Sequence, residues 1–66
     1  MAEALFECEA NCIRERRLCL LVEIDGDEIW IPKSQIHDNS EVYDAGDHSE
    51  GTLVITEWIA KEKGLL

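Results

Sequence analysis

The chain has 66 residues with 15 acidic and 6 basic side chains, and its formal net charge is -9. A chain this short forms one domain, residues 1–66, and buries only about 60% of the surface that its unfolded form exposes, which leaves no room for a deep catalytic cleft. Because 45% of the residues are hydrophobic, the composition is that of a folded chain and not of a disordered acidic one. We therefore expect a small non-enzymatic binding protein whose negative electrostatic field favours basic partners.

The N-terminus and the cysteines bear on location and metal binding. The first residues contain no basic region followed by an apolar run, and the longest apolar stretch, residues 18–22, is too short to span a membrane. Three cysteines without a CxxC pair give neither a disulfide framework nor a four-ligand zinc site. We expect a protein of the host-cell cytoplasm with reduced thiols, no membrane partner, no cofactor and no metal, in which Cys8 and Cys12 face the core.

The first half of the chain predicts strands. Residues 4–12 alternate between apolar and polar with a period of two, which indicates a strand with one buried face, and the polar run 14–17 ends it. A second strand follows over residues 18–24. Asp25-Gly26 then supplies the residues that a tight hairpin turn requires.

A two-residue turn at this point fixes the register of the hairpin. Val22 then faces Ile29 and Leu20 faces Ile31 on one side of the sheet, whereas Leu21 lies beside Trp30 on the other. The second and third strands are therefore apolar on both faces, and one short helix can cover only one of them. We expect barrel closure, a second copy in a homodimer, or a partner to cover the other face.

The second half predicts irregular structure between short elements. Pro32 lacks the N–H that a strand ladder uses, so the third strand ends at Ile31, and residues 33–36 form a single helical turn. Loops rich in Asp, Asn, Ser and Gly flank a short strand at residues 41–43, and residues 52–55 form the last strand.

The C-terminal segment predicts a two-turn helix. Thr56 can cap its first turn, Gly64 is placed for a left-handed stop, and Trp58 and Ile59 are expected to lie on the sheet. Trp58 is expected in the core in preference to Trp30. The predicted fold is α+β: a small antiparallel sheet or open β-barrel of four to five strands with a short C-terminal helix.

Two of these segments carry a further signal. They are Trp30-Ile31-Pro32-Lys33-Ser34-Gln35-Ile36 and Glu57-Trp58-Ile59-Ala60, the second followed by a Glu-Lys-Gly-Leu run. This pattern resembles a group of short proteins encoded by phages and prophages, over about residues 18–65. The resemblance implies a genomic setting rich in short accessory proteins that inhibit host defences, and it implies no functional residue.

Acidic turns and loops supply the candidate binding residues. Carboxylates at the hairpin tip and in the two later loops are predicted to present a nearly continuous negative surface, which can imitate a phosphate backbone and bind the basic surface of a host nucleic-acid-handling or defence protein, such as a CRISPR effector. The alternative interpretation is that these acids serve solubility alone. The predicted partner-binding residues are Asp25, Asp27, Glu28, Trp30, Asp38, Glu41, Asp44, Asp47 and Glu50.

Other functions remain open at this stage. The runner-up is a small barrel that binds an oligonucleotide or nucleotide on a platform of Trp30, Tyr43 and Lys33, although a net charge of -9 opposes phosphate binding. A structural subunit of a phage particle or regulatory complex is a third. The acids and His48 within residues 44–50 lack the spacing of a calcium loop, so a solvated acidic loop is the preferred interpretation.

Overall fold

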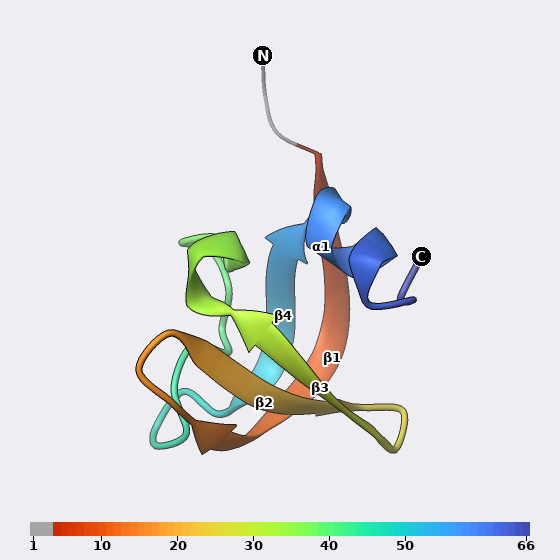
Figure 1. Ribbon diagram of the computed structural model, residues 1–66. Coiled ribbons are helices and arrows are strands. Elements are labelled where there is room, and N and C mark those ends of the chain that lie inside the picture. Colours follow the sequence, from red (N-terminus) through yellow and green to blue (C-terminus); the bar gives the residue numbers. More distant parts are fainter. Residues whose placement is uncertain (1–3) are drawn as a thin grey trace.

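The protein is a four-stranded antiparallel sheet with one short helix near its C-terminus, as a computed structural model that describes residues 4–66 shows (Figure 1). The spatial order of the strands is β3-β2-β1-β4, so β3 and β4 are the two edges and the sheet does not close into a barrel. The predicted antiparallel sheet with a C-terminal helix is confirmed, and closure of a barrel is wrong. The elements are β1 Leu5–Glu15, β2 Cys19–Ile24, β3 Asp27–Pro32, the 3-10 turn η1 Lys33–Gln35, β4 Glu50–Thr56 and α1 Glu57–Glu62.

The β2–β3 hairpin has the predicted turn and register. Asp25 and Gly26 both adopt left-handed conformations, with φ of 52° and 86°, as a two-residue type I′ turn requires. Val22 pairs with Ile29 and Leu21 with Trp30, as the turn chemistry predicted. Local turn residues therefore determine the register of this half of the sheet.

Two strands run further than their sequences predicted. β1 continues to Glu15 because a bulge between Cys12 and Arg14 lets it keep pairing with β2. β3 includes Pro32, which pairs with Cys19. Because β3 is an edge strand, one of its sides has no partner strand. A proline nitrogen on that side loses no hydrogen bond of the sheet.

The strand predicted at residues 41–43 does not form. The chain instead runs along the free edge of β4, where Ile36 forms an isolated antiparallel bridge with Ile55. The backbone N–H of His37 donates to the carbonyl of Val54 at 2.8 Å. Hydrogen bonds from the side chains and backbone of this segment to β4 replace the regular strand that was predicted at residues 41–43.

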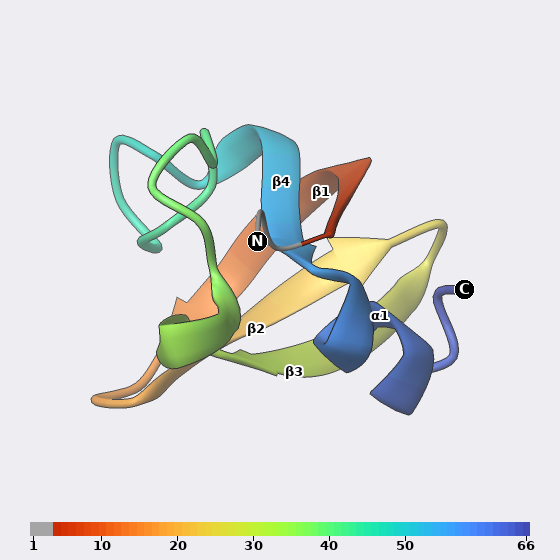
Figure 2. The same cartoon turned by 90° about the horizontal axis from the view of Figure 1, so that it is seen from above.

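The core lies on one side of the sheet, beneath α1 and the segment that follows η1 (Figure 2). The prediction that Cys8 and Cys12 face the core is confirmed, since Cys12 is buried and Cys8 packs against the cluster. The fully buried large side chains are Leu20, Val22, Ile31, Val42, Leu53 and Ile55. The other side of the sheet, called the outer face below, is therefore left for polar and partly buried side chains.

The helix is capped as predicted, but only one of its two predicted core residues is buried. The N–H of Ile59 donates to the hydroxyl of Thr56 at 3.3 Å, and Gly64 adopts φ of 77° after the last turn. Trp58 is 60% exposed, so its predicted place in the core is wrong, whereas Ile59 is buried as expected. The face of α1 that meets the core carries Ile59 and Ala60, and Trp58 lies outside it. Within residues 4–66 no helix is long and apolar enough to cross a membrane.

Candidate functional site

Exposed glutamates lie in neighbouring rows on the outer face of the sheet. The strand pairing places Glu50, Asn11, Glu23 and Glu28 in one row across all four strands. Glu9 and then Glu7 follow along β1, each two residues further and therefore about 7 Å from the last. We call the set Glu7, Glu9, Glu23, Glu28 and Glu50 the acidic face.

The carboxylates of the acidic face have almost no internal partners. Within residues 4–66 the one side-chain contact of the set is a 3.5 Å hydrogen bond that the hydroxyl of Thr52 donates to Glu9. Glu23 and Glu28 are directly opposed in the β2–β3 register, where like charges disfavour the pairing. Their negative charge is therefore open to a partner outside the chain.

The predicted acidic residues fall into two separate groups. Asp25 and Asp27 lie at the tip of the hairpin, next to Glu28 of the acidic face. Figures 1 and 2 both place this tip at the other side of the molecule from the segment of residues 37–49. The two groups therefore do not adjoin directly, and Glu50, Glu23 and Glu28 lie in the row of the sheet between them. The members on the distant segment are Asp38, Glu41, Asp44 and Asp47.

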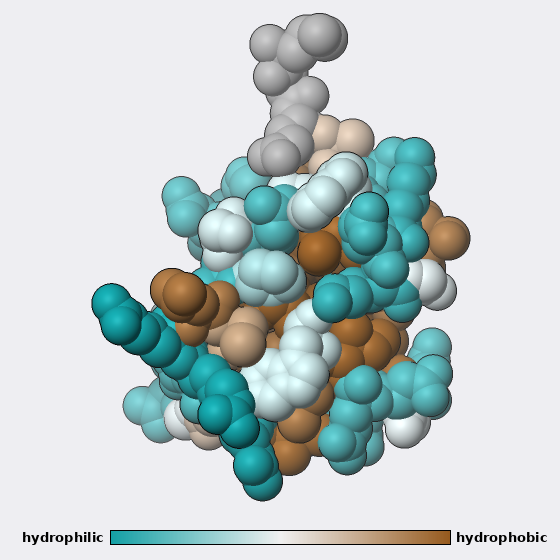
Figure 3. All heavy atoms as spheres, in the orientation of Figure 1, coloured by the Kyte–Doolittle hydropathy of each residue, from teal (hydrophilic) through white to brown (hydrophobic). Residues whose placement is uncertain are grey.

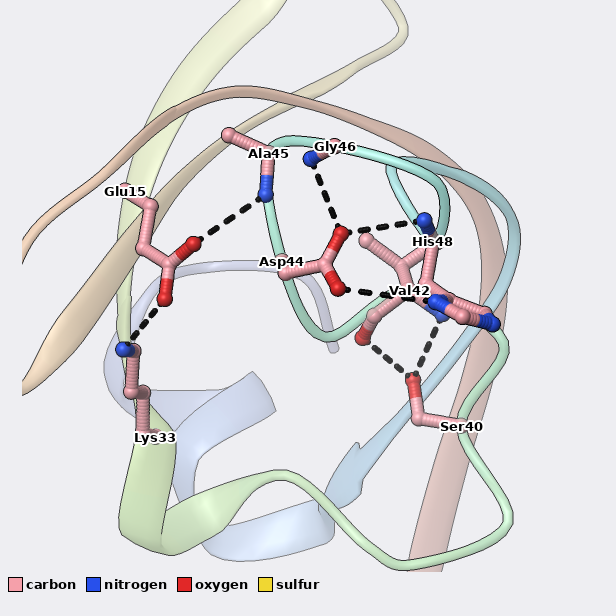
Figure 4. A network of polar contacts seen from close by, with 8 residues as sticks. All are labelled: Glu15, Lys33, Ser40, Val42, Asp44, Ala45, Gly46 and His48. Atoms are coloured by element: carbon pink, nitrogen blue, oxygen red, sulfur yellow. Dashed lines mark hydrogen bonds and ion pairs between the residues drawn. The ribbon is translucent and has the colours of Figure 1, made fainter.

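Asp44 organises the loop in which it lies (Figure 4). One oxygen of its carboxylate accepts hydrogen bonds from the N–H of Gly46 at 2.8 Å and from the N–H of His48 at 3.0 Å. The other oxygen lies 3.5 Å from Nδ1 of His48, whose ring stacks on Tyr43 with centroids 4.3 Å apart. The backbone hydrogen bond from His48, followed by that from Gly46, holds the pKa of Asp44 below its ordinary value.

Glu15 connects this loop to the end of the sheet. One oxygen of its carboxylate lies 2.6 Å from Nζ of Lys33, and the other accepts a 3.3 Å hydrogen bond from the N–H of Ala45. The hydrogen bond from Lys33 is the main reason that the pKa of Glu15 lies below its ordinary value. These bonds join β1, η1 and the loop.

Ser40 and Glu41 hold the start of the segment against β4. The buried hydroxyl of Ser40 donates to the carbonyl of Val42 at 2.8 Å and accepts from the N–H of Val54 at 3.1 Å. The carboxylate of Glu41 accepts from the N–H of Thr52 at 2.8 Å. Glu41 and Asp44 therefore stabilise the fold through internal hydrogen bonds, which leaves less of their acceptor capacity for a partner.

A cleft opens between η1 and the segment that follows it. It has a volume of about 380 Å³ and is lined by Lys33, Ile36, His37, Asp38 and Tyr43. The platform predicted from Trp30, Tyr43 and Lys33 is thus divided, because only the last two line the cleft. Trp30 pairs with Leu21 on the outer face.

The described residues offer little for catalysis. Within residues 4–66 no three His, Cys, Asp or Glu side chains are grouped so that they could hold a metal ion. Burial raises the pKa of the Cys8 and Cys12 thiols, which keeps them protonated and poorly nucleophilic at neutral pH.

Three members of the acidic face are absent from the residues predicted as partner-binding. Glu7, Glu9 and Glu23 lie in strands, whereas the prediction selected acids in turns and loops. The sequence did contain a signal for Glu7 and Glu9, because they alternate with core residues and must point outwards.

Comparison with known proteins finds no matching family model, no similar curated protein and no similar solved structure.

Proposed function

We propose that the protein acts by stoichiometric, non-enzymatic binding, with its acidic face placed against the basic surface of a nucleic-acid-handling protein. In the phage or prophage setting, the partner is a host defence complex such as a CRISPR effector, and the protein is its inhibitor. The observation that carries the proposal is the set of five exposed glutamates in adjacent rows of one sheet face, of which only Glu9 accepts a side-chain hydrogen bond from the part of the chain that the structure describes. Two further carboxylates, Asp25 and Asp27, extend the negative charge at the hairpin tip.

The spacing of these charges favours collective action. The Cα positions of Glu23 and Glu28 on neighbouring strands are about 5 Å apart and those of Glu7 and Glu9 along β1 about 7 Å, both within the Debye length of about 8 Å at physiological ionic strength. A rigid sheet also holds them in place before binding, so little ordering is required when a partner arrives. Such a face gives fast, salt-sensitive association with a groove lined by Lys and Arg.

Two variants of equal net charge test which acids bind the partner. The face variant replaces Glu7, Glu9, Glu23 and Glu28 with glutamine. The control variant neutralises four acids outside the acidic face, through Asp38→Asn, Asp47→Asn, Glu57→Gln and Glu62→Gln. Each is immobilised beside the wild-type protein, and nuclease-treated bacterial lysate is passed over all three at moderate salt. We expect a near-stoichiometric nuclease or defence-complex subunit on the wild type and the control variant but not on the face variant.

The purified partner then tests the mechanism. Displacement of a fluorescent oligonucleotide from that partner is followed by anisotropy as the small protein is added. Competition that weakens with salt and with the face variant supports occupation of the nucleic-acid groove. Retention of the partner by the face variant, or binding without displacement of the oligonucleotide, contradicts the proposal.

The cleft favours a second candidate function, binding of a nucleotide or oligonucleotide. Tyr43, which is exposed, and Lys33, whose ammonium group is paired with Glu15, both line this cleft of about 380 Å³, a size suited to a small ligand. Equilibrium dialysis with labelled mononucleotides tests it, with Tyr43→Ala as the disruptive variant and Trp58→Ala as the matched aromatic control outside the cleft. Binding that Tyr43→Ala abolishes and Trp58→Ala retains supports this candidate, and no retention by the wild type excludes it.

A further inference from the structure

An apolar row crosses the outer face next to the acidic residues. Leu21 pairs with Trp30, and both side chains are half-buried although the sheet does not close over them. Ile13 lies at the bulge in β1, next to Arg14, which pairs with Leu21, and it is 45% exposed. Figure 3 shows this pale and brown surface over β2 and β3, with hydrophilic side chains on both sides of it.

The basic side chains of this region lie at that row and beyond the end of it that faces away from Glu23 and Glu28. Arg14 pairs with Leu21 within it, and the guanidinium carbon of Arg16 lies 5.4 Å from the centroid of the Trp30 ring. Arg17 follows in the loop, and all three are exposed. We call Arg14, Arg16 and Arg17 the arginine end. These are the only arginines of the sequence, and the darkest teal of Figure 3 gathers on this side, where β1 meets the β1–β2 loop.

Charge therefore changes sign along the strands of one face. Glu23 and Glu28 lie one row to one side of the Leu21–Trp30 pair, and the arginine end lies within that row and on its other side. Neighbouring rows of one face are about 7 Å apart. An arginine side chain of one molecule can therefore reach the glutamate row of a molecule that faces it. The face is thus complementary to itself when turned end to end.

We propose that the outer face binds a second copy of this chain. Two copies packed face to face about a two-fold axis that runs across the strands, between the Leu21–Trp30 row and the Glu23–Glu28 row, set Arg14 and Arg16 of each copy against the glutamate row of the other. The apolar rows lie on either side of this axis, and each contact occurs twice, as an isologous interface requires. A uniformly acidic face would repel its own copy, whereas this one places opposite charges together.

The dimer has a consequence for binding of a basic partner. Glu23 and Glu28 belong to both surfaces, so self-association and binding through the acidic face compete for the same carboxylates. The dimer itself does not rest on the proposed function. Oligomeric state is measured on the purified protein alone, so failure of one proposal is distinguishable from failure of the other.

Paired charge reversals test the interface by sedimentation velocity over a wide range of protein concentrations. One variant carries Arg14→Glu and Arg16→Glu, and the other carries Glu23→Arg and Glu28→Arg. We expect the wild type to form dimers that weaken with salt, and each variant alone to self-associate roughly 100-fold more weakly because like charges meet. An equimolar mixture of the two variants is expected to restore a 1:1 dimer, which also shows that both variants are folded.

A matched control separates a specific face from general attraction between oppositely charged proteins. The variant with Asp38→Arg and Asp47→Arg has the same charge change as the glutamate reversals but leaves the outer face intact. It is expected to remain monomeric when mixed with the arginine-reversed variant at the concentrations that restore the heterodimer. A wild type that stays monomeric throughout, a mixture that fails to associate, or equal association by the control overturns the proposal.

Discussion

The acidic face and the segment of residues 37–49 both carry carboxylates, but they use them differently. Glu23 and Glu28 project from paired strands and form no side-chain hydrogen bond or ion pair within residues 4–66, whereas Glu41 and Asp44 accept backbone hydrogen bonds that hold an irregular segment together. A strand already satisfies its backbone through its neighbours, so its outward side chains remain available. A loop lacks such neighbours, and its acids supply the missing acceptors.

The largest expected effect concerns Ser40, because its hydroxyl is buried and bonded to two backbone N–H groups, those of Val42 and Val54. Ser40→Ala leaves these donors without that acceptor, which we expect to lower the free energy of unfolding by about 1–3 kcal/mol. Urea unfolding measures the loss, with the exposed Ser34→Ala as the matched control. A Ser40→Ala variant as stable as the control would show that the segment is not held by this hydroxyl.

Gly51 marks the point where the segment joins β4. Its φ is 132°, and an added Cβ would lie 2.7 Å from Oε1 of Glu41. Gly51→Ala is expected to cost about 1–3 kcal/mol of stability through backbone strain and displacement of that carboxylate. Gly46→Ala is the control, because a Cβ there would meet the Asp44 carboxylate at an ordinary 3.6 Å. Equal thermal midpoints for the two variants would contradict the close contact.

Acid should loosen the segment before the sheet. The pKa values of Asp44 and Glu15 lie below their ordinary values in the folded protein, so their stabilisation is present above about pH 4.5 and is lost as the pH falls through the folded-state values. We expect the thermal midpoint to fall below about pH 4.5. Asp44→Asn should flatten this dependence, whereas Asp47→Asn should retain it. An identical pH profile for both variants would argue against the role of Asp44.

The smallest expected effect lies on the acidic face. Glu28→Gln removes the repulsion between two cross-strand glutamates, and we expect it to raise the free energy of unfolding by about 0.2–1 kcal/mol. Glu62→Gln, in the exposed part of α1, controls for the change in net charge. Denaturant titration at low salt measures the difference. Destabilisation by Glu28→Gln alone would mean that this carboxylate has a structural role after all.

Local signals made the β2–β3 hairpin and the helix cap predictable from the sequence. Asp25 and Gly26 determine the turn and with it the register, and Thr56 precedes the helix that it caps. The path of residues 37–49 could not be predicted in this way. It depends on bonds between residues far apart in the chain, such as those from Val54 to Ser40 and from Ala45 to Glu15, and no local pattern encodes them.

The candidate site was predictable only in part, for the same reason. Turn composition located Asp25, Asp27 and Glu28, but which loop acids are engaged follows from the tertiary bonds. The alternation of β1 contained Glu7 and Glu9, and joining them to Glu50 required the pairing of β1 with β4. Trp58 shows the converse, since an apolar residue in a short amphipathic helix was expected in the core and is exposed.

The most direct measurement of the central claim is an NMR titration of the isotopically labelled protein with a short oligo-lysine peptide, a defined probe for a basic partner. The account predicts that amide resonances of Glu7, Glu9, Glu23, Glu28 and Glu50 shift together and that these shifts disappear in the face variant and at high salt. Shifts concentrated in residues 37–49, with the acidic face unaffected, would contradict this account. They would show that the loop residues, and not the acidic face, bind the basic peptide.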